Sequence, residues 1–341
     1  RPTIVTPTAI TTVSTAVLPD PGVTTTVSAT SKPIPWARPG ATGRLIFTQG
    51  EKGIIELDMV SGKQTTLYAP PANAAVRAVS VSPDGKQMVM AYAPPPPADQ
   101  AQLGFTDLYV MPADGSQSPT PVLIHSGQTE LYTTPLWSPD GKYLYYGHFT
   151  VKVTDSGLVT EYSLNRLVHP GGEPELVAEG AFWPQFSPDG SKIIYISYDV
   201  ANDISDLVVA NADGSDAQLV MPHGSFVAID APLFYPTGDS IIFSAVGDDP
   251  SAALTWLDRV LGVQIVSAHD IPSDFWRVSL DTGKIERLTK LGAVGMYADF
   301  SPDGQLMAFI TTSGIFLSRP DGTELKTLLN LDKTGTLEWL P

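Results

Sequence analysis

The chain has 341 residues, enough for one large domain or two ordinary ones, and 43% of them are hydrophobic, so it can bury a sizeable core. Its net charge is −16, and a surface of this sign repels nucleic-acid phosphates and anionic lipid headgroups, so we expect no nucleic-acid partner. There is no cysteine, which excludes disulfides, thiol catalysis and thiolate metal sites.

Residues 1–42 differ from the rest of the chain, because they are rich in Thr and Pro and carry almost no charge. We predict a separate region at this end, either an extended tether or an arm that lies along the folded domain through residues such as Ile10 and Val17. The sequence begins at Arg1 rather than Met, so we expect that a signal or lipid-anchor segment has been removed. The protein is therefore expected outside the cytoplasm, in the periplasm or at the cell surface, with membrane contact only through such an anchor.

A turn of sequence Ser-Pro-Asp-Gly recurs from residue 43 onward, each time after an apolar or aromatic residue. The full copies are Val81–Gly85, Trp137–Gly141, Phe186–Gly190 and Phe300–Gly304, and Phe234–Gly238 is a degenerate copy. Pro presets φ at the second position of a tight turn, and Gly relieves strain at its exit. A strand-like run such as Lys142–Tyr146 follows each copy, so every repeat is predicted to contain a strand, this turn and a second strand.

A second turn, built on Gly, follows later in each repeat and occurs at Ser61-Gly62, Asp114-Gly115, Gly171-Gly172, Asp213-Gly214, Thr282-Gly283 and Asp321-Gly322. The first kind of turn has one copy fewer, and the C-terminus supplies the missing strand, because Leu337–Pro341 resembles the strand before Ser-Pro. Residues 43–341 thus divide into repeats of about 50 residues, the size of a four-stranded propeller blade.

We therefore predict an all-β fold, a six-bladed β-propeller over residues 43–341. Its first blade is shared between residues 43–70 and 335–341, which closes the ring and removes its exposed sheet edges. The other blades are predicted at residues 76–125, 131–179, 180–222, 226–290 and 294–331.

These Ser-Pro-Asp-Gly turns, with Asp-Gly hairpins downstream, resemble the TolB-like repeat family of six-bladed propellers over nearly all of residues 43–341. The resemblance implies the propeller fold. It implies less about function, because the family includes partner-binding periplasmic proteins and its repeats also occur in propellers attached to peptidases.

The sequence offers no catalytic machinery. It lacks a Gly-x-Ser-x-Gly elbow, and its histidines stand far apart without His-x-x-x-His spacing, at His125, His148, His169, His223 and His269. The Asp of the first turn recurs from blade to blade, as a turn residue must and a functional carboxylate need not. We expect no catalytic residue, no cofactor and no essential divalent metal.

Strand alternation divides the loops between two faces. Turns after the first and third strands of each blade share one face, which we call the short-turn face. Connections after the second and fourth strands share the other, the long-loop face, where we also expect the channel entrance. Insertions after second strands are predicted at residues 93–105, 151–159 and Gly247–Asp274.

The third insertion is predicted to contain a helix, because Asp249 is a good N-cap, Pro250 suits the first helical position and Gly262 can end the helix. Trp256 falls on the apolar face of this helix. That face either packs on the propeller or docks a partner.

Alignment of the innermost strands places a set of residues at the channel mouth, namely Arg77, Phe182, Trp183, Asp230, Met296 and Tyr297, with Tyr132 and His223 in nearby connections. Aromatic residues beside an Arg and an Asp make a recognition surface. Together with Trp256 they are the candidate binding residues of a non-enzymatic propeller that recognises a protein or peptide partner. Two alternatives stay open: a lactonase-like hydrolase or glycan lyase at the channel mouth, and a sugar- or small-molecule-binding propeller.

Overall fold

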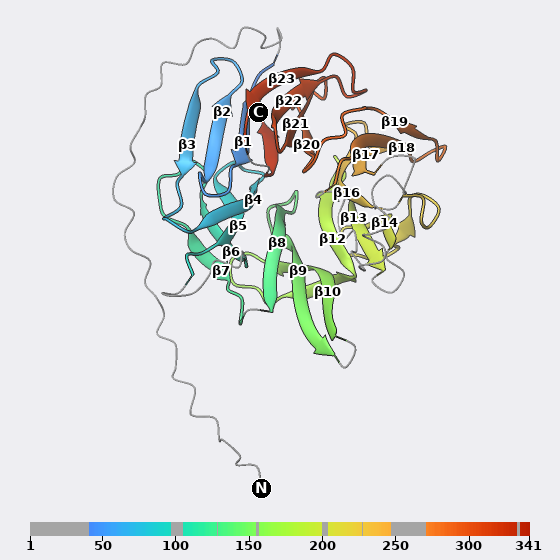
Figure 1. The fold of residues 1–341 in the computed structure, drawn as a ribbon. Helices are drawn as coiled ribbons and strands as arrows, with labels where there is room; N and C mark the ends of the chain where they lie inside the picture. The colour runs from blue at the N-terminus through green and yellow to red at the C-terminus, as the bar shows by residue number, and fades with distance from the viewer. Residues whose placement is uncertain are drawn as a thin grey trace.

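A computed structural model of the chain describes residues 41–96, 105–127, 129–154, 157–199, 204–226, 228–246, 271–332 and 335–341. In these ranges the regular elements are strands, which form six sheets of four strands around a common centre (Figure 1). No helix in the same ranges is long and apolar enough to cross a membrane. The predicted six-bladed β-propeller is confirmed.

Each sheet is one blade, and its strands follow one another from the centre outward. Blade 1 consists of β24 (Leu337–Leu340), β1 (Arg44–Thr48), β2 (Ile54–Asp58) and β3 (Gln64–Tyr68). Blade 2 consists of β4 (Ala75–Val81), β5 (Gln87–Ala93), β6 (Asp107–Pro112) and β7 (Thr120–Leu123). Blade 3 consists of β8 (Glu130–Trp137), β9 (Tyr143–Thr154), β10 (Gly157–Val168) and β11 (Glu175–Glu179).

The remaining blades have the same order. Blade 4 consists of β12 (Ala181–Phe186), β13 (Lys192–Asp199), β14 (Ile204–Asn211) and β15 (Gln218–Leu219). Blade 5 consists of β16 (Ile229–Phe234), β17 (Ser240–Ala245), β18 (Asp274–Ser279) and β19 (Ile285–Arg287). Blade 6 consists of β20 (Tyr297–Phe300), β21 (Met307–Thr311), β22 (Gly314–Ser318) and β23 (Lys326–Asn330).

The ring closes where the C-terminal strand β24 pairs antiparallel with β1, with Leu337 opposite Phe47 and Trp339 opposite Leu45. Leu337 is 2% exposed and Trp339 is 4% exposed, and both pack in the core between blades 1 and 6. Trp339 also donates its Nε1–H to the carbonyl of Thr42 at 2.9 Å. The predicted sharing of blade 1 between the two ends of the domain is confirmed.

The Ser-Pro-Asp-Gly turns are held by one recurring set of hydrogen bonds. In blade 3, Ser138 Oγ donates to Asp140 Oδ1 at 2.5 Å and accepts the backbone N–H of Tyr143 at 2.8 Å, while the N–H of Lys142 donates to the same Asp140 oxygen at 3.0 Å. The carboxylates of Asp84, Asp189 and Asp303 are bound in the same way. These hydrogen bonds lower the pKa of the turn carboxyls, to about 2 at Asp84 and Asp189.

Two of the three predicted insertions lie partly outside the described residues, at 97–104 and at 247–270. The second of these ranges contains the predicted helix and Trp256. The insertion at 151–159 was expected to be a loop, but most of it is β-strand. Strands β9 and β10 pair continuously from Tyr143 opposite Val168 to Thr154 opposite Gly157. Residues 151–154 and 157–159 thus extend two paired strands, a conformation that their β-branched residues favour.

Candidate recognition site in the central channel

The innermost strands of four blades are irregular where the sequence predicted the channel mouth. Strand pairing shifts its register at Arg77 in blade 2, Thr134–Pro135 in blade 3, Trp183–Pro184 in blade 4 and Ala231–Pro232 in blade 5. Proline has no N–H to donate to a sheet, so a bulge accommodates it by interrupting the pairing. Thr134, Trp183 and Ala231 take φ values of 43°, 56° and 45°. A bulge also re-aims the side chain beside it, and the side chain of Trp183 lines the central cavity.

A cavity of about 530 Å³ occupies the centre of the ring and is lined by the innermost strands of all six blades. Its lining includes Pro188, Pro236 and Ser301–Gly304, which belong to the Ser-Pro-Asp-Gly turns, so the cavity reaches the short-turn face. The sequence had placed the entrance among the long loops. This cavity instead reaches the short-turn face, and Trp183 of blade 4 and Tyr297 of blade 6, with ring centroids 5.8 Å apart, lie on its side away from the turns. An entrance on the long-loop face stays a prediction.

Trp183 and Tyr297 are the predicted binding residues that line the cavity, and they form its floor. Their neighbours in the sequence, which were also predicted as binding residues, do not line the cavity. The side chains of Phe182 and Met296 are buried in the cores between blades. The difference follows from the alternation of side chains along a strand, which sends neighbours to opposite sides.

The other predicted residues lie away from the cavity. Arg77 is exposed at its bulge, and Asp230 is fully buried. Tyr132 is buried as well, while His223 is exposed and its Nδ1 lies 2.6 Å from a carboxylate oxygen of Asp206. The part these residues play in binding stays a prediction.

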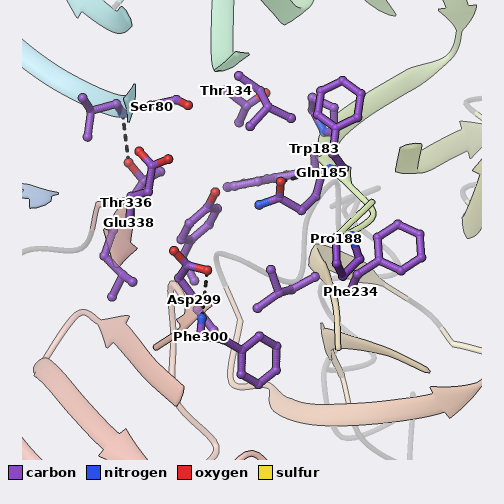
Figure 2. Close-up of a pocket in the computed structure, with 18 of the residues that line it drawn as sticks. Ser80, Thr134, Trp183, Gln185, Pro188, Phe234, Asp299, Phe300, Thr336 and Glu338 are labelled. Atoms are coloured by element: carbon purple, nitrogen blue, oxygen red, sulfur yellow. Dashed lines mark hydrogen bonds between the residues drawn. The ribbon is translucent and has the colours of Figure 1, made fainter. Parts of the chain in front are cut away.

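Sequence alignment missed the ring of side chains nearest the turns. In each blade, the residue just before the apolar or aromatic residue near the end of the innermost strand lines the cavity. This ring consists of Ser80, Leu136, Gln185, Leu233, Asp299 and Glu338. Figure 2 shows Asp299 and Glu338 on one side of the cavity, with Trp183 and Gln185 on the opposite side. Asp299 and Glu338 each stand directly before the aromatic residue near the end of their inner strand. This shared position of two acids is the signal in the sequence that could have revealed the site.

Asp299 and Glu338 join the closing strand β24 to the blades on both sides of it. Asp299 Oδ2, on β20, accepts the N–H of Trp339 at 2.7 Å, and its Oδ1 accepts the N–H of Phe300 at 2.8 Å. Glu338 Oε2, on β24, accepts the N–H of Val81 at 2.6 Å. An innermost strand has no further strand on its channel side, so these N–H groups need side-chain acceptors.

The same two carboxyl groups are weaker acids than usual, because their pKa values are raised. Burial raises the pKa of Asp299 to about 7 and the pKa of Glu338 to about 8, and the charge of Asp299 adds to the rise at Glu338. Burial also raises the pKa of Tyr297, as do both carboxylates. Among the described residues that line the cavity there is no Lys, Arg or His.

Metal binding finds no support in the described part of the chain, where no three His, Asp or Glu side chains are grouped closely enough to hold an ion. What the cavity does offer is an aromatic floor, hydrogen-bond acceptors fixed by backbone N–H groups and an amide at Gln185. This arrangement suits recognition of a polar or charged group.

No family model matches the chain. Among curated proteins, an uncharacterized protein from Agrobacterium fabrum is 22% identical over 249 residues, which cover 62% of this chain and 76% of that protein. Dipeptidyl-peptidase 5 from Porphyromonas gingivalis is 26% identical over 179 residues, which cover 50% of this chain. The chain spans only 22% of the length of that peptidase.

Several solved structures share the fold. TolB from Acinetobacter baumannii superposes with a TM-score of 0.58 at 14% identity, over 86% of this chain and 66% of that one. The nidogen/laminin complex gives 0.58 at 10% identity, over 86% of this chain and 97% of the matched chain. Oligogalacturonate lyase from Vibrio parahaemolyticus gives 0.50 at 11% identity, over 85% and 80%. At such identities the likeness concerns the fold and not the function. The chain has the fold of the TolB-like six-bladed β-propellers.

Proposed function

We propose that this chain is a non-enzymatic binding propeller that recognises a protein or peptide partner at its central channel. The observation that carries the proposal is the cavity of about 530 Å³, which combines the aromatic floor of Trp183 and Tyr297 with the polar side chains of Gln185, Asp299 and Glu338. Aromatic residues ringed by polar groups are typical of the centres of interfaces. A cavity of this size is also within the usual range for binding sites.

The cellular setting belongs to the same proposal. The likeness to TolB structures supports a location outside the cytoplasm, and the nidogen propeller, solved in complex with laminin, supports a protein as partner. Residues 1–42 are proposed to be a tether or arm of the folded domain 43–341, with any membrane contact through an anchor that precedes it. The long-loop face, with Arg77, Tyr132, His223 and Trp256, is the second surface proposed for docking.

Site-specific photo-crosslinking tests the proposal. A photoreactive phenylalanine would replace Pro188 or Pro302, both exposed at the rim of the cavity, in cells that make the full chain. Control positions are Val60 and Leu219, exposed on the outer strands and turns of their blades. We expect a discrete protein adduct from the rim positions alone. Equal labelling from the control positions, or none from the rim, would reject the channel as the recognition site.

A second candidate function is a channel enzyme of the hydrolase or lyase type. The pKa values of Asp299 and Glu338, about 7 and 8, favour it, because such carboxyl groups exchange protons near neutral pH. Against it, both carboxylates accept backbone N–H groups, which already gives them a structural reason to be present. Turnover of oligogalacturonate or an aliphatic lactone that is lost in Asp299→Asn, at an unchanged melting temperature, would replace the binding proposal.

A further inference from the structure

The channel cavity contains two carboxyl groups and no compensating positive charge. Elsewhere, several buried or half-buried acids lie beside a basic side chain, as Asp274 does with Arg287 and Asp107 with His125. In the described part of the chain, Asp299 and Glu338 enter no such ion pair, and the cavity lining supplies no cation. A carboxylate enclosed by protein is costly without a counter-ion, so an incoming cation would be stabilised in the cavity more than at the surface.

The two carboxylates are held in fixed positions before any ligand arrives. Asp299 accepts one N–H on each oxygen, and Glu338 accepts the N–H of Val81 on Oε2. A carboxylate oxygen has two lone-pair sites, so each group keeps capacity for a further donor. Fixed acceptors lose little conformational entropy when a ligand binds, which favours affinity.

The rest of the cavity suits a long cationic side chain rather than a small ion. The rings of Trp183 and Tyr297 form the floor, where they can contact the ammonium or guanidinium group at the tip of such a side chain. Gln185 lies opposite the carboxyl groups (Figure 2). Asp303 lies at the rim and its pKa is lowered by hydrogen bonds from Ser301 and Gln305, so it adds negative charge at the entrance.

We propose that the channel binds a lysine or arginine side chain of the partner, which enters from the short-turn face and places its cationic group beside Asp299 and Glu338, above the rings of Trp183 and Tyr297. This inference rests on the proposed function and adds the chemistry of the group that is recognised. A neutral or acidic peptide would lack the interaction and would leave the two carboxyl groups without a counter-ion.

Small probes test the proposal on the full chain. N-acetyl-lysine N-methylamide and N-acetyl-arginine N-methylamide carry the cation, while the norleucine and citrulline analogues have the same shape without the charge. We expect the cationic probes to bind about tenfold or more tightly than their neutral analogues in calorimetric titration. Glu338→Gln should remove most of this preference. The matched control is Glu175→Gln, because Glu175 pairs with Arg166 on the outside of blade 3 and should not affect binding.

The wild-type chain gives a second measurement that does not depend on a variant folding. Among the described residues, the titratable groups that line the cavity are Asp299, Glu338, Asp303 and Tyr297. The pKa of Asp303 is lowered and that of Tyr297 is raised, so the two channel carboxyls, with pKa values of about 7 and 8, are those that ionise near neutral pH. Affinity for the lysine probe should rise through that range, while affinity for the norleucine probe stays level.

The outcomes separate this inference from the proposed function. Equal binding of cationic and neutral probes overturns the inference, and rim crosslinks to a protein would then still support channel recognition. No binding of either cationic probe up to about 10 mM also overturns it. Loss of the rim crosslinks, with the cationic preference intact, would instead reject the protein partner and leave a cation-binding channel.

Discussion

The carboxylate of Asp299 on β20 accepts the backbone N–H of Trp339 on β24 at 2.7 Å. Blade 6 is thereby fastened to the strand that closes the ring. On the other side of that strand, Glu338 accepts the N–H of Val81 in blade 2 at 2.6 Å. The acidic groups of the cavity are therefore also the groups that hold the last strand in place, so the proposed cation site and ring closure share the same side chains.

Truncation of Trp339 to Ala should destabilise the whole propeller. Its indole is 4% exposed, packs between blades 1 and 6 and bonds to the carbonyl of Thr42. We expect a loss in unfolding free energy of about 3 kcal/mol or more, measured by urea denaturation. The control is Val60→Ala at a site that is 72% exposed, which should change stability by less than about 0.5 kcal/mol. Overlapping unfolding curves for the two variants would contradict the buried closing strand.

Two glycines of nearly the same backbone conformation provide a matched test of closure. Gly43 has φ of 83° and Gly171 has φ of 82°, so alanine is strained at both. A Cβ at Gly43 would lie 2.1 Å from the carbonyl oxygen of Leu340 in the closing strand, whereas one at Gly171 meets no atom within 4 Å. We expect Gly43→Ala to lower the unfolding free energy by about 1–3 kcal/mol more than Gly171→Ala. Equal losses would mean that β24 does not approach residue 43.

The propeller was predictable because its turns are local and repeated. Ser138 bonds to Asp140 and to Tyr143, two and five residues further along the chain, and the same contacts recur at the other Ser-Pro-Asp-Gly copies. The ring closure was predictable by counting, since Leu337–Pro341 supplied the strand that the first repeat lacked. Such features need no knowledge of how blades face one another.

The channel chemistry was not predictable in the same way. Asp299 and Glu338 belong to different blades, and only the closed ring brings them to one wall. The comparison of inner strands chose Trp183 and Tyr297, which line the cavity, together with Phe182 and Met296, which are buried between blades, because it did not separate the two sides of those strands. Bulges before Pro184 and its counterparts shift that alternation, and their register depends on tertiary pairing.

The turn hydrogen bonds should be measurable at Ser138. Its buried hydroxyl accepts the N–H of Tyr143 and donates to Asp140, so Ser138→Ala leaves both without that partner. We expect a loss of about 1–2 kcal/mol in unfolding free energy, with probe binding in the channel unchanged. Ser118→Ala, at an exposed position, is the control and should melt as the wild type does. A Ser138→Ala variant as stable as the control would show that solvent replaces the lost acceptor.

Replacement of Glu338 by Gln should change how stability depends on pH. The folded-state pKa of Glu338 is about 8, whereas an unfolded glutamate has a pKa of about 4.3. Between these values the unfolded chain has released the proton and the folded chain has kept it, so wild-type stability falls as pH rises. Gln does not titrate and can still accept the N–H of Val81 through its amide oxygen. The stability of Glu338→Gln relative to wild type should therefore increase with pH.

Urea denaturation at about pH 5, 7 and 9 measures this change, and the gap should widen by on the order of 1 kcal/mol or more between the ends of the range. Asp299, with a pKa of about 7, remains in both proteins, so the widening above pH 7 reports chiefly on Glu338. The turn carboxyls of Asp84 and Asp189 ionise near pH 2 and contribute a constant offset across this window. Glu175→Gln removes a half-exposed carboxylate and should run parallel to wild type at all three values. If Glu338→Gln ran parallel as well, Glu338 would ionise like a surface residue, and the enclosed carboxyl pair that the proposed cation site requires would not exist.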